Sequence, residues 1–434
     1  MRVSPDAVET YEAEVRQYYW RNFILALVDN TMFFFIYLGL SPYTVLPFYL
    51  GRLTDSQVLI GLIPATYVLG FALPQVFVAR LLQRRRRRKG LLVAFAAAQR
   101  VGILGFLLLT GVQNRLPPSL TIVLFFLCFT IQHVASGCWY PTWVDFIGRS
   151  IPRNRGMLFG WSNFIGGVFS IVGGVLLTYL LETLPYPGAV TAIAAIAFVA
   201  SLISLTAILG WHEVVPPGEL PEMTSVRPVA HVAAALRQDA NFRNYLIWRG
   251  LIIGLEMALP FYSLHALQSL RLADAQLGIF TLILSVSQTI MHPVWGWLGD
   301  RKGYLTIVAA AAISGALGAF LAANANSVVL YYAVFWCAGV MLSGLQIAGI
   351  NIIYELSSAA QVPMYAAVSQ ITLSPLSALA PLVGGFLARR FGYVTDFWIA
   401  GLVGSGGVLG LLLSLRNPSR RPADAGQGLR PRQF

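Results

Sequence analysis

The sequence predicts an all-α polytopic membrane protein with 12 transmembrane helices, arranged as two pseudo-symmetric six-helix bundles. Three observations lead to this fold class. Of the 434 residues, 57% are hydrophobic and 11% are charged, whereas soluble proteins carry about 25% charged residues. Twelve apolar runs have the roughly 20 residues that a helix needs to cross the hydrocarbon core. The two halves of the chain also repeat each other, with matching segments in the same order.

The predicted spans divide the chain into two bundles and three polar segments. The N-terminal bundle occupies 22–211 and the C-terminal bundle 245–415, with tails at 1–21 and 416–434 and a linker at 212–244. The predicted spans are 22–48, 57–81, 91–112, 119–139, 157–181, 188–211, 245–267, 276–298, 304–323, 327–348, 365–388 and 394–415.

The linker contains apolar residues at the spacing of one helix face. These residues are Val229, Val232, Ala233 and Leu236. We therefore expect a short amphipathic helix that lies at the membrane surface and ties the two bundles together.

The Lys and Arg residues predict that both termini are cytoplasmic. An even number of spans places both termini on one side. If that side is inside, the inside segments hold 22 of the 30 basic residues, the outside segments five and the spans three. This asymmetry follows the positive-inside rule and indicates a multi-pass protein of the inner (plasma) membrane, which we expect to be monomeric. The basic run at 84–89 is interpreted as a lipid anchor rather than a nucleic-acid site, because no aromatic residues interleave with it.

The internal repeat is visible in short matching segments. "TDSQVLIG" (54–61) matches "ADAQLGIF" (273–280), and "IVGGVLL" (171–177) matches "LVGGFLA" (382–388). Their shared order indicates a duplication of six spans. Such repeats are typical of secondary transporters, whose substrate site lies near the membrane midplane between the halves.

The segment "GWLGDRKGY" lies between the predicted spans eight and nine. Its residues Gly296, Asp300, Arg301 and Gly303 follow a pattern of the major facilitator superfamily. The chain therefore resembles that family over nearly its whole length. The resemblance implies a transporter fold and does not identify a substrate.

The resemblance also implies a cytoplasmic gate. Asp300 would lie at the N-terminus of the helix that begins near Arg155, and Arg301 would pair with Glu355. These contacts would close the cytoplasmic side and break when it opens. In the first half the motif is absent, but the basic run could pair with Asp145. The alternative is a tight turn with solvated charges.

Two acids lie deep in predicted spans, Asp29 in "LALVDNTMFFF" and Glu256 in span seven. A charge at the bilayer centre costs roughly 2.5–3.5 kcal/mol, so each acid should face the bundle interior or water and have a partner. We expect both to bind protons or substrate in the central cavity. The alternative is a pair of static ion pairs, Asp29 with Arg100 and Glu256 with Arg249. For Arg100 the structural role is preferred, because span three is usually peripheral.

Other polar residues are further candidates for the cavity. His133 stands where proton-driven antiporters of the resembled family carry an arginine, and it could titrate near neutral pH or be a hydrogen-bonded packing residue. The remaining candidates are Asn30, Gln288, His292, Gln346 and Gln370.

The expected function is secondary active transport of a small organic solute by alternating access. We expect coupling to protons and favour export of amphipathic compounds. Nutrient uptake by symport and uncoupled facilitation remain open, as does a transport-inactive membrane sensor or scaffold. The sequence lacks the phosphate-binding loop, the HExxH zinc motif and the GxSxG elbow, so we expect neither an enzyme nor a resident cofactor or metal.

Overall fold

The computed structural model describes residues 5–83, 85–152, 154–217, 239–356 and 362–414. The N-terminal half contains α1 (Pro5–Gly39), α2 (Val45–Gly51), α3 (Gln57–Gln83), α4 (Lys89–Val112), η1 (Gln113–Arg115), α5 (Pro118–Ser150), α6 (Arg155–Thr183) and α7 (Gly188–Gly210). The C-terminal half contains α9 (Ala240–Ile252), η2 (Ile253–Met257), η3 (Leu259–Phe261), α10 (Tyr262–Ser269), α11 (Gln276–Lys302), α12 (Tyr304–Ala323), α13 (Val328–Leu356), α14 (Val362–Phe391) and α15 (Tyr393–Ser414). The linker helix predicted around Val229 and the C-terminal tail lie outside the described residues.

The all-helical fold class is confirmed. Within the described residues, 11 spans are long and apolar enough to cross a membrane. The twelfth helix is α1, which packs against α6 and α7. This helix begins at Pro5 rather than at 22, so residues predicted as a polar tail extend the first span as one continuous helix.

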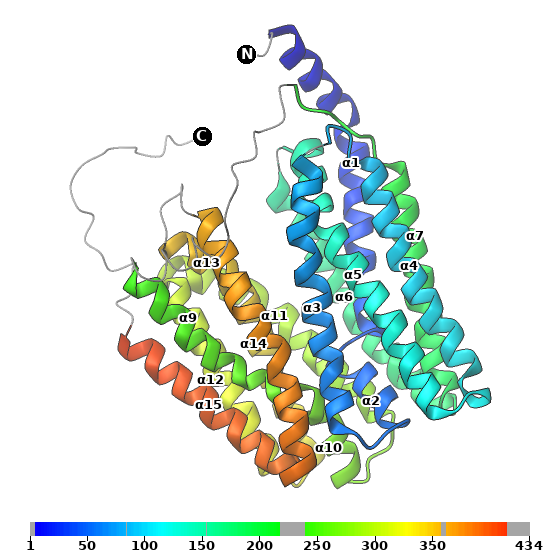
Figure 1. Cartoon of the computed structure of the whole chain (residues 1–434), viewed down its shortest axis with the longest axis vertical. Helices are drawn as coiled ribbons and strands as arrows, with labels where there is room; N and C mark the ends of the chain where they lie inside the picture. The colour runs from blue at the N-terminus through cyan, green and yellow to red at the C-terminus, as the bar shows by residue number, and fades with distance from the viewer. Residues whose placement is uncertain (1–4, 84, 153, 218–238, 357–361, 415–434) are drawn as a thin grey trace.

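The first and seventh spans, which are repeat mates, are both broken, although each was predicted as one continuous helix. In the seventh, Pro260 has no N–H to bond the carbonyl of Glu256, and the helix tightens into η2 and η3 before it resumes as α10. In the first, α1 ends at Gly39 and the chain resumes as α2 after Pro42. The short helices α2 and α10 pack together at one end of the molecule (Figure 1).

The two halves meet at the end that carries α2 and α10, which we call the closed end (Figure 1). There α3 packs against α14, and α6 packs against α11. The approach is close enough to require glycine. A Cβ added to Gly61 would lie 2.2 Å from the carbonyl oxygen of Pro381, and one added to Gly385 would lie 2.4 Å from that of Gln57. Arg52, after α2, also forms an ion pair with Asp274, before α11.

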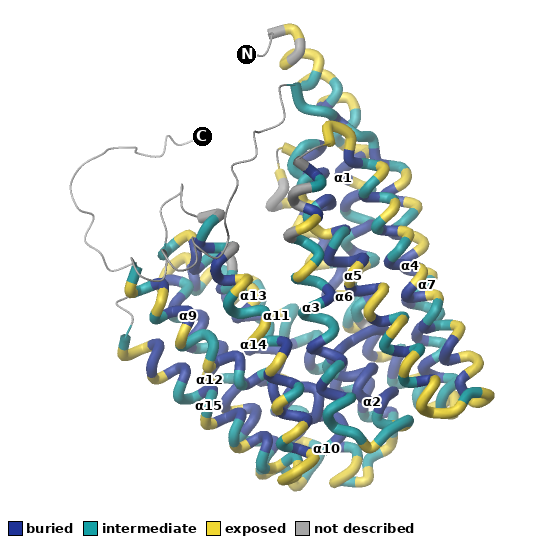
Figure 2. The backbone as a smooth tube through the Cα atoms, in the orientation of Figure 1, coloured by how far each residue is buried: buried dark blue, intermediate teal, exposed yellow. Residues whose placement is uncertain are grey.

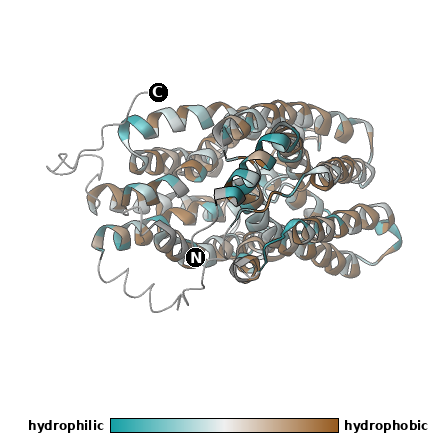
Figure 3. Cartoon of the chain, turned by 90° about the horizontal axis from the view of Figure 1, so that it is seen from above, coloured by the Kyte–Doolittle hydropathy of each residue, from teal (hydrophilic) through white to brown (hydrophobic). Residues whose placement is uncertain are grey.

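The beginning of α1 and the end of α15 lie at the other end, which we call the terminal end (Figure 1). Buried residues gather where the halves meet, whereas outward-facing positions of the helices are exposed (Figure 2). Many exposed residues are large and apolar, including Leu108, Phe164 and Leu413, and hydrophobic residues run along the helices seen from above (Figure 3). A lipid bilayer would cover this surface.

Candidate functional site: a cavity between the halves

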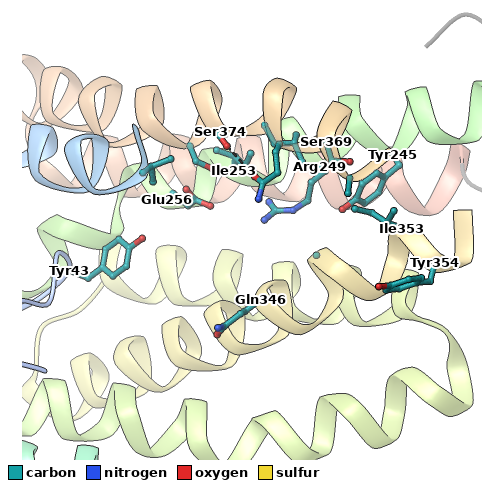
Figure 4. Close-up of a pocket in the computed structure, with 16 residues that line it drawn as sticks. Tyr43, Tyr245, Arg249, Ile253, Glu256, Gln346, Ile353, Tyr354, Ser369 and Ser374 are labelled. Carbon is teal, nitrogen blue, oxygen red and sulfur yellow. Dashed lines mark hydrogen bonds between the residues drawn. The ribbon is translucent and has the colours of Figure 1, made fainter. Parts of the chain in front are cut away.

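A cavity of about 440 Å³ lies mainly in the C-terminal half (Figure 4). This volume suits a small organic molecule. Ten of its 16 lining residues have polar side chains: Tyr43, Tyr245, Arg249, Glu256, Gln346, Tyr354, Ser369, Gln370, Ser374 and Ser377. The cavity extends to Tyr354, which is 61% exposed near the terminal end of α13. The site is therefore polar and directed toward the terminal end.

Arg249 and Glu256 lie on one wall of the cavity, where α9 passes into η2 (Figure 4). No N–O distance between them falls within 4.0 Å, so the static ion pair considered from the sequence is not formed. Glu256 instead interacts with the Ser377 hydroxyl. Nη1 of Arg249 is buried and has no hydrogen-bond partner among the described residues. The wall therefore presents two separated, opposite charges to the cavity.

Most of the remaining polar groups come from α14 and α13, apart from Tyr245 on α9 and Tyr43 between α1 and α2. Along α14, Gln370, Ser374 and Ser377 recur on one helix face, and the Ser374 hydroxyl donates to Oε1 of Gln370 at 3.2 Å. From α13, Gln346 faces this wall and contacts His292 Nε2 at 3.4 Å. Arg249, Glu256, Gln346 and Gln370 were candidates from the sequence. The serines were missed, although their recurrence on an apolar helix is a usable signal.

Asp29 was expected in the central cavity, and the structure corrects this expectation. The side chain is buried within the N-terminal bundle and does not line the cavity. Trp143 Nε1 donates to Oδ2 at 2.8 Å, and the Ser204 hydroxyl donates to Oδ1 at 2.5 Å. Because α1 packs on α6 and α7, its polar residue at this level points toward the bundle interior.

Arg100 is joined to Asp29 indirectly. Its Nη2 donates to the Ser204 hydroxyl at 2.5 Å, and its other nitrogens donate to Ser201 O, Ala96 O and Gln99 Oε1. The direct ion pair considered from the sequence is therefore replaced by a serine bridge. These contacts fit the structural role preferred for Arg100 from the sequence, which stays a prediction.

Three other candidates also lie outside the cavity, and a fourth, His292, contacts its lining residue Gln346 without lining the cavity itself. His133 is buried in α5, where its Nδ1 contacts Phe129 O at 3.0 Å and its ring packs on Tyr67. Asn30 and Gln288 are half-buried and do not line the cavity. The predictions that place these three side chains in the cavity are wrong for this conformation, because a polar residue in an apolar run does not reveal its helix face.

At the terminal end, the predicted pair of Arg301 with Glu355 is not formed, and the predicted partner of Asp300 at the start of α6 lies outside the described side chains. Asp300 accepts a hydrogen bond from the Tyr304 hydroxyl at 2.8 Å. Arg301 stacks over the Trp297 ring, 4.2 Å from its centroid. Glu355 accepts from the Tyr304 N–H at 2.9 Å, because the free N–H groups at the start of α12 attract a carboxylate. Burial raises the pKa of Glu355 above its usual value, and hydrogen bonds from backbone N–H groups oppose this shift.

In the first half, Asp145 pairs with Arg88 of the basic run and with Arg149, at 2.9 Å from its Nε. The first contact was expected from the sequence. Arg155 begins α6, and its side chain lies outside the described residues. Gly303 has a φ of 86° between α11 and α12, a conformation that favours glycine. A Cβ on Gly296 would meet nothing within 4 Å, so its place in the motif has no packing reason.

The sequence matches the model of the Major Facilitator Superfamily twice, over residues 24–262 and 250–434. The chain therefore belongs to the Major Facilitator Superfamily, whose fold is that of secondary transporters. The first match covers the N-terminal half and continues to residue 262, and the second covers the C-terminal half from residue 250. No curated protein matches the sequence.

Several solved transporters share the fold. The nucleoside transporter NupG is 12% identical with a TM-score of 0.71, and covers 92% of this chain and 99% of its own. The D-xylose-proton symporter is 14% identical with a TM-score of 0.68 and the same coverage. A partially occluded inward-open form of the xylose transporter XylE from E. coli is 12% identical with a TM-score of 0.64, and covers 95% of this chain and 100% of its own. At these identities the likeness concerns the fold alone.

Proposed function

We propose that this protein is a proton-coupled secondary active transporter of a small organic solute, which binds in the cavity between the halves and crosses by alternating access. The single observation that carries the proposal is Glu256, a carboxylate on the wall of a cavity of small-molecule size. It is the only acid that lines this cavity among the described residues. A similar fold occurs in a D-xylose-proton symporter, which makes proton coupling a reasonable choice.

The proposed mechanism follows from the cost of enclosing a charge. When the cavity is open, water stabilises the Glu256 carboxylate. When it closes, an uncompensated charge inside the membrane costs several kcal/mol, so the protonation state of Glu256 biases which conformations form. Asp29 has no coupling role in this proposal, because its partners are fixed and it does not face the cavity.

We further propose that the terminal end is cytoplasmic, that the protein lies in the inner membrane and that one chain is sufficient. The excess of Lys and Arg on that side supports the orientation. With that orientation, the inter-half packing at the closed end corresponds to an inward-facing conformation. One chain is sufficient because it encloses the cavity alone.

Export of an amphipathic compound is the second candidate function. The observation in its favour is the apolar part of the cavity wall, formed by Val68, Ile253 and Leu373. The ten polar side chains on the same wall favour a polar solute instead.

The test is transport in proteoliposomes with an imposed proton gradient. Wild-type protein should accumulate or exchange a solute when the gradient is present. Glu256→Gln should still bind the solute and exchange it across the membrane, but should lose gradient-driven accumulation. If Glu256→Gln accumulates solute as wild type does, the coupling role is excluded. Gln370→Asn, which keeps an amide on the same cavity, should retain coupling.

A further inference from the structure

We infer that the solute carries an anionic group that binds Nη1 of Arg249, and that this solute moves together with a proton on Glu256. This inference rests on the proposed function and names its substrate class and its coupling mode. It starts from an unsatisfied donor. Nη1 of Arg249 is buried, yet no hydrogen-bond acceptor among the described residues reaches it.

The surroundings of Arg249 leave this donor available to a ligand. Tyr245, one turn earlier on α9, interacts with the guanidinium. Glu256 lies two turns further along, attracts Arg249 through space and contacts Ser377, without an N–O distance to Arg249 within 4.0 Å. A buried guanidinium nitrogen without an acceptor is costly, and a carboxylate or phosphonate satisfies it with a charge-assisted bond. The cavity supplies the space for such a group.

Charge balance then sets the direction of coupling. The empty cavity carries one positive charge on Arg249 and one negative charge on Glu256, so it can close without net charge. A bound monoanion adds one negative charge, and a proton on Glu256 removes it. The loaded cavity that can close therefore contains the anion and the proton together, which defines symport. A zwitterion keeps the balance without a proton and would cross uncoupled.

Other titratable groups do not supply this proton. The remaining charged or titratable residues that line the cavity are Arg249 and the three tyrosines Tyr43, Tyr245 and Tyr354. From α14 the groups next to Glu256 are the uncharged Ser374, Ser377 and Gln370, and neither α12 nor α15 contributes to the lining. A tyrosine is neutral near pH 7 and has no proton to gain. Glu256 is therefore the acceptor.

The experiment uses four charge forms of one scaffold. For each common amino acid with an uncharged side chain, the N-acetyl acid is an anion, the free acid a zwitterion, the amide a cation and the N-acetyl amide neutral. Full-length protein in detergent is screened for thermal stabilisation by each form, since a ligand stabilises in proportion to its occupancy. The expected ligands are anions, and Arg249→Gln should weaken them at least tenfold, roughly the value of one charge-assisted hydrogen bond. Lys302→Gln removes a positive charge outside the cavity and should not weaken anion binding. Arg249→Lys should recover part of the affinity that Arg249→Gln loses.

A second readout separates this inference from the proposed function. Binding of the anion in weakly buffered solution should take up about one proton per site in wild type and none in Glu256→Gln. Three outcomes would overturn the anion site. The ligands could prove to be neutral or cationic, no form could stabilise the protein, or the anions could bind Arg249→Gln as well as they bind wild type. If the ligands are neutral or cationic, or if the anions bind without Arg249, gradient-driven transport could still be observed and the proposed function would stand. Anions that depend on Arg249 but bind without proton uptake would overturn the symport and the coupling role of Glu256 together.

Discussion

The guanidinium of Arg52 binds both carboxylate oxygens of Asp274 and thereby joins the two halves at the closed end. The side chains are 46% and 31% exposed, and pairs this accessible contribute at most about 1 kcal/mol. The contact can therefore bias the equilibrium between conformations but cannot hold it alone. Most of the closure comes from the packing of α3 on α14 and of α6 on α11.

Removal of this ion pair should shift the conformational equilibrium modestly. Arg52→Ala is expected to increase the population open at this end by up to about fivefold, the value of 1 kcal/mol. The measurement is the distance distribution between spin labels on cysteines introduced at Asn114 and Asn326, with the three native cysteines replaced. The exchanged pair, Arg52→Asp with Asp274→Arg, should restore the wild-type distribution. An unchanged distribution in Arg52→Ala would show that the pair has no latching role.

The close approach of α3 and α14 gives a stronger prediction. In Gly61→Ala the new methyl group would lie 2.2 Å from the Pro381 carbonyl oxygen, so the helices must separate. Overpacking of this kind costs about 1–3 kcal/mol, and the spin-label distances should lengthen more than in Arg52→Ala. Gly111→Ala is the control, because a Cβ there meets nothing within 4 Å. Equal spin-label distances in Gly61→Ala and Gly111→Ala would contradict the close packing of α3 on α14.

Asp29 should stabilise the N-terminal bundle. Asp29→Ala leaves Trp143 and Ser204 without their shared acceptor and the buried Arg100 without the carboxylate that balances its charge. Removal of one partner of a buried charge network costs about 3–5 kcal/mol. The melting temperature in detergent should fall clearly. Glu9→Ala, at an exposed position of the same helix, should leave it unchanged. A folded Asp29→Ala protein with normal stability and lost proton coupling would return Asp29 to the transport mechanism.

Glu355 gives a prediction about pH. Its pKa is raised in the folded state, so its contribution to stability is present below the unfolded value of about 4.3 and is lost as the pH rises through the folded value. Glu355→Gln keeps an acceptor for the Tyr304 N–H without the charge. It should therefore melt above wild type at pH 7.5 and approach it only as the pH falls below the unfolded value, whereas Glu355→Ala loses the cap and about 1 kcal/mol. A constant difference between Gln and wild type across this pH range would contradict the raised pKa.

The number of helices and their division into halves could be predicted from the sequence, because the bilayer thickness sets the length of each apolar run. The breaks after Gly39 and Ile252 could not, since an apolar run looks the same whether its backbone is α-helical or tightened. Pro260 was the available signal for the second break.

The cavity was predicted in part. Arg249, Glu256 and Gln370 reach it because a charge or amide in a span that lines the interface has few other places to point. Asp29 and His133 do not, because packing within the N-terminal bundle fixes the rotation of their helices.

Asp396 was missed because it lies close to the start of a predicted span. It is 0% exposed, and neither carboxylate oxygen has a hydrogen-bond partner among the described residues.

The uneven lining of the cavity has a consequence for how this protein could change its specificity. Among the described residues, only Tyr43 and Val68 of the lining come from the N-terminal half, so most contacts to a bound solute would come from one half of a duplicated chain. Substitutions on α13 and α14 could therefore retune the choice of solute one residue at a time. The N-terminal half, which the serine-bridged pair of Asp29 and Arg100 stabilises, would stay unchanged during such a series of substitutions and would move against the altered half as before.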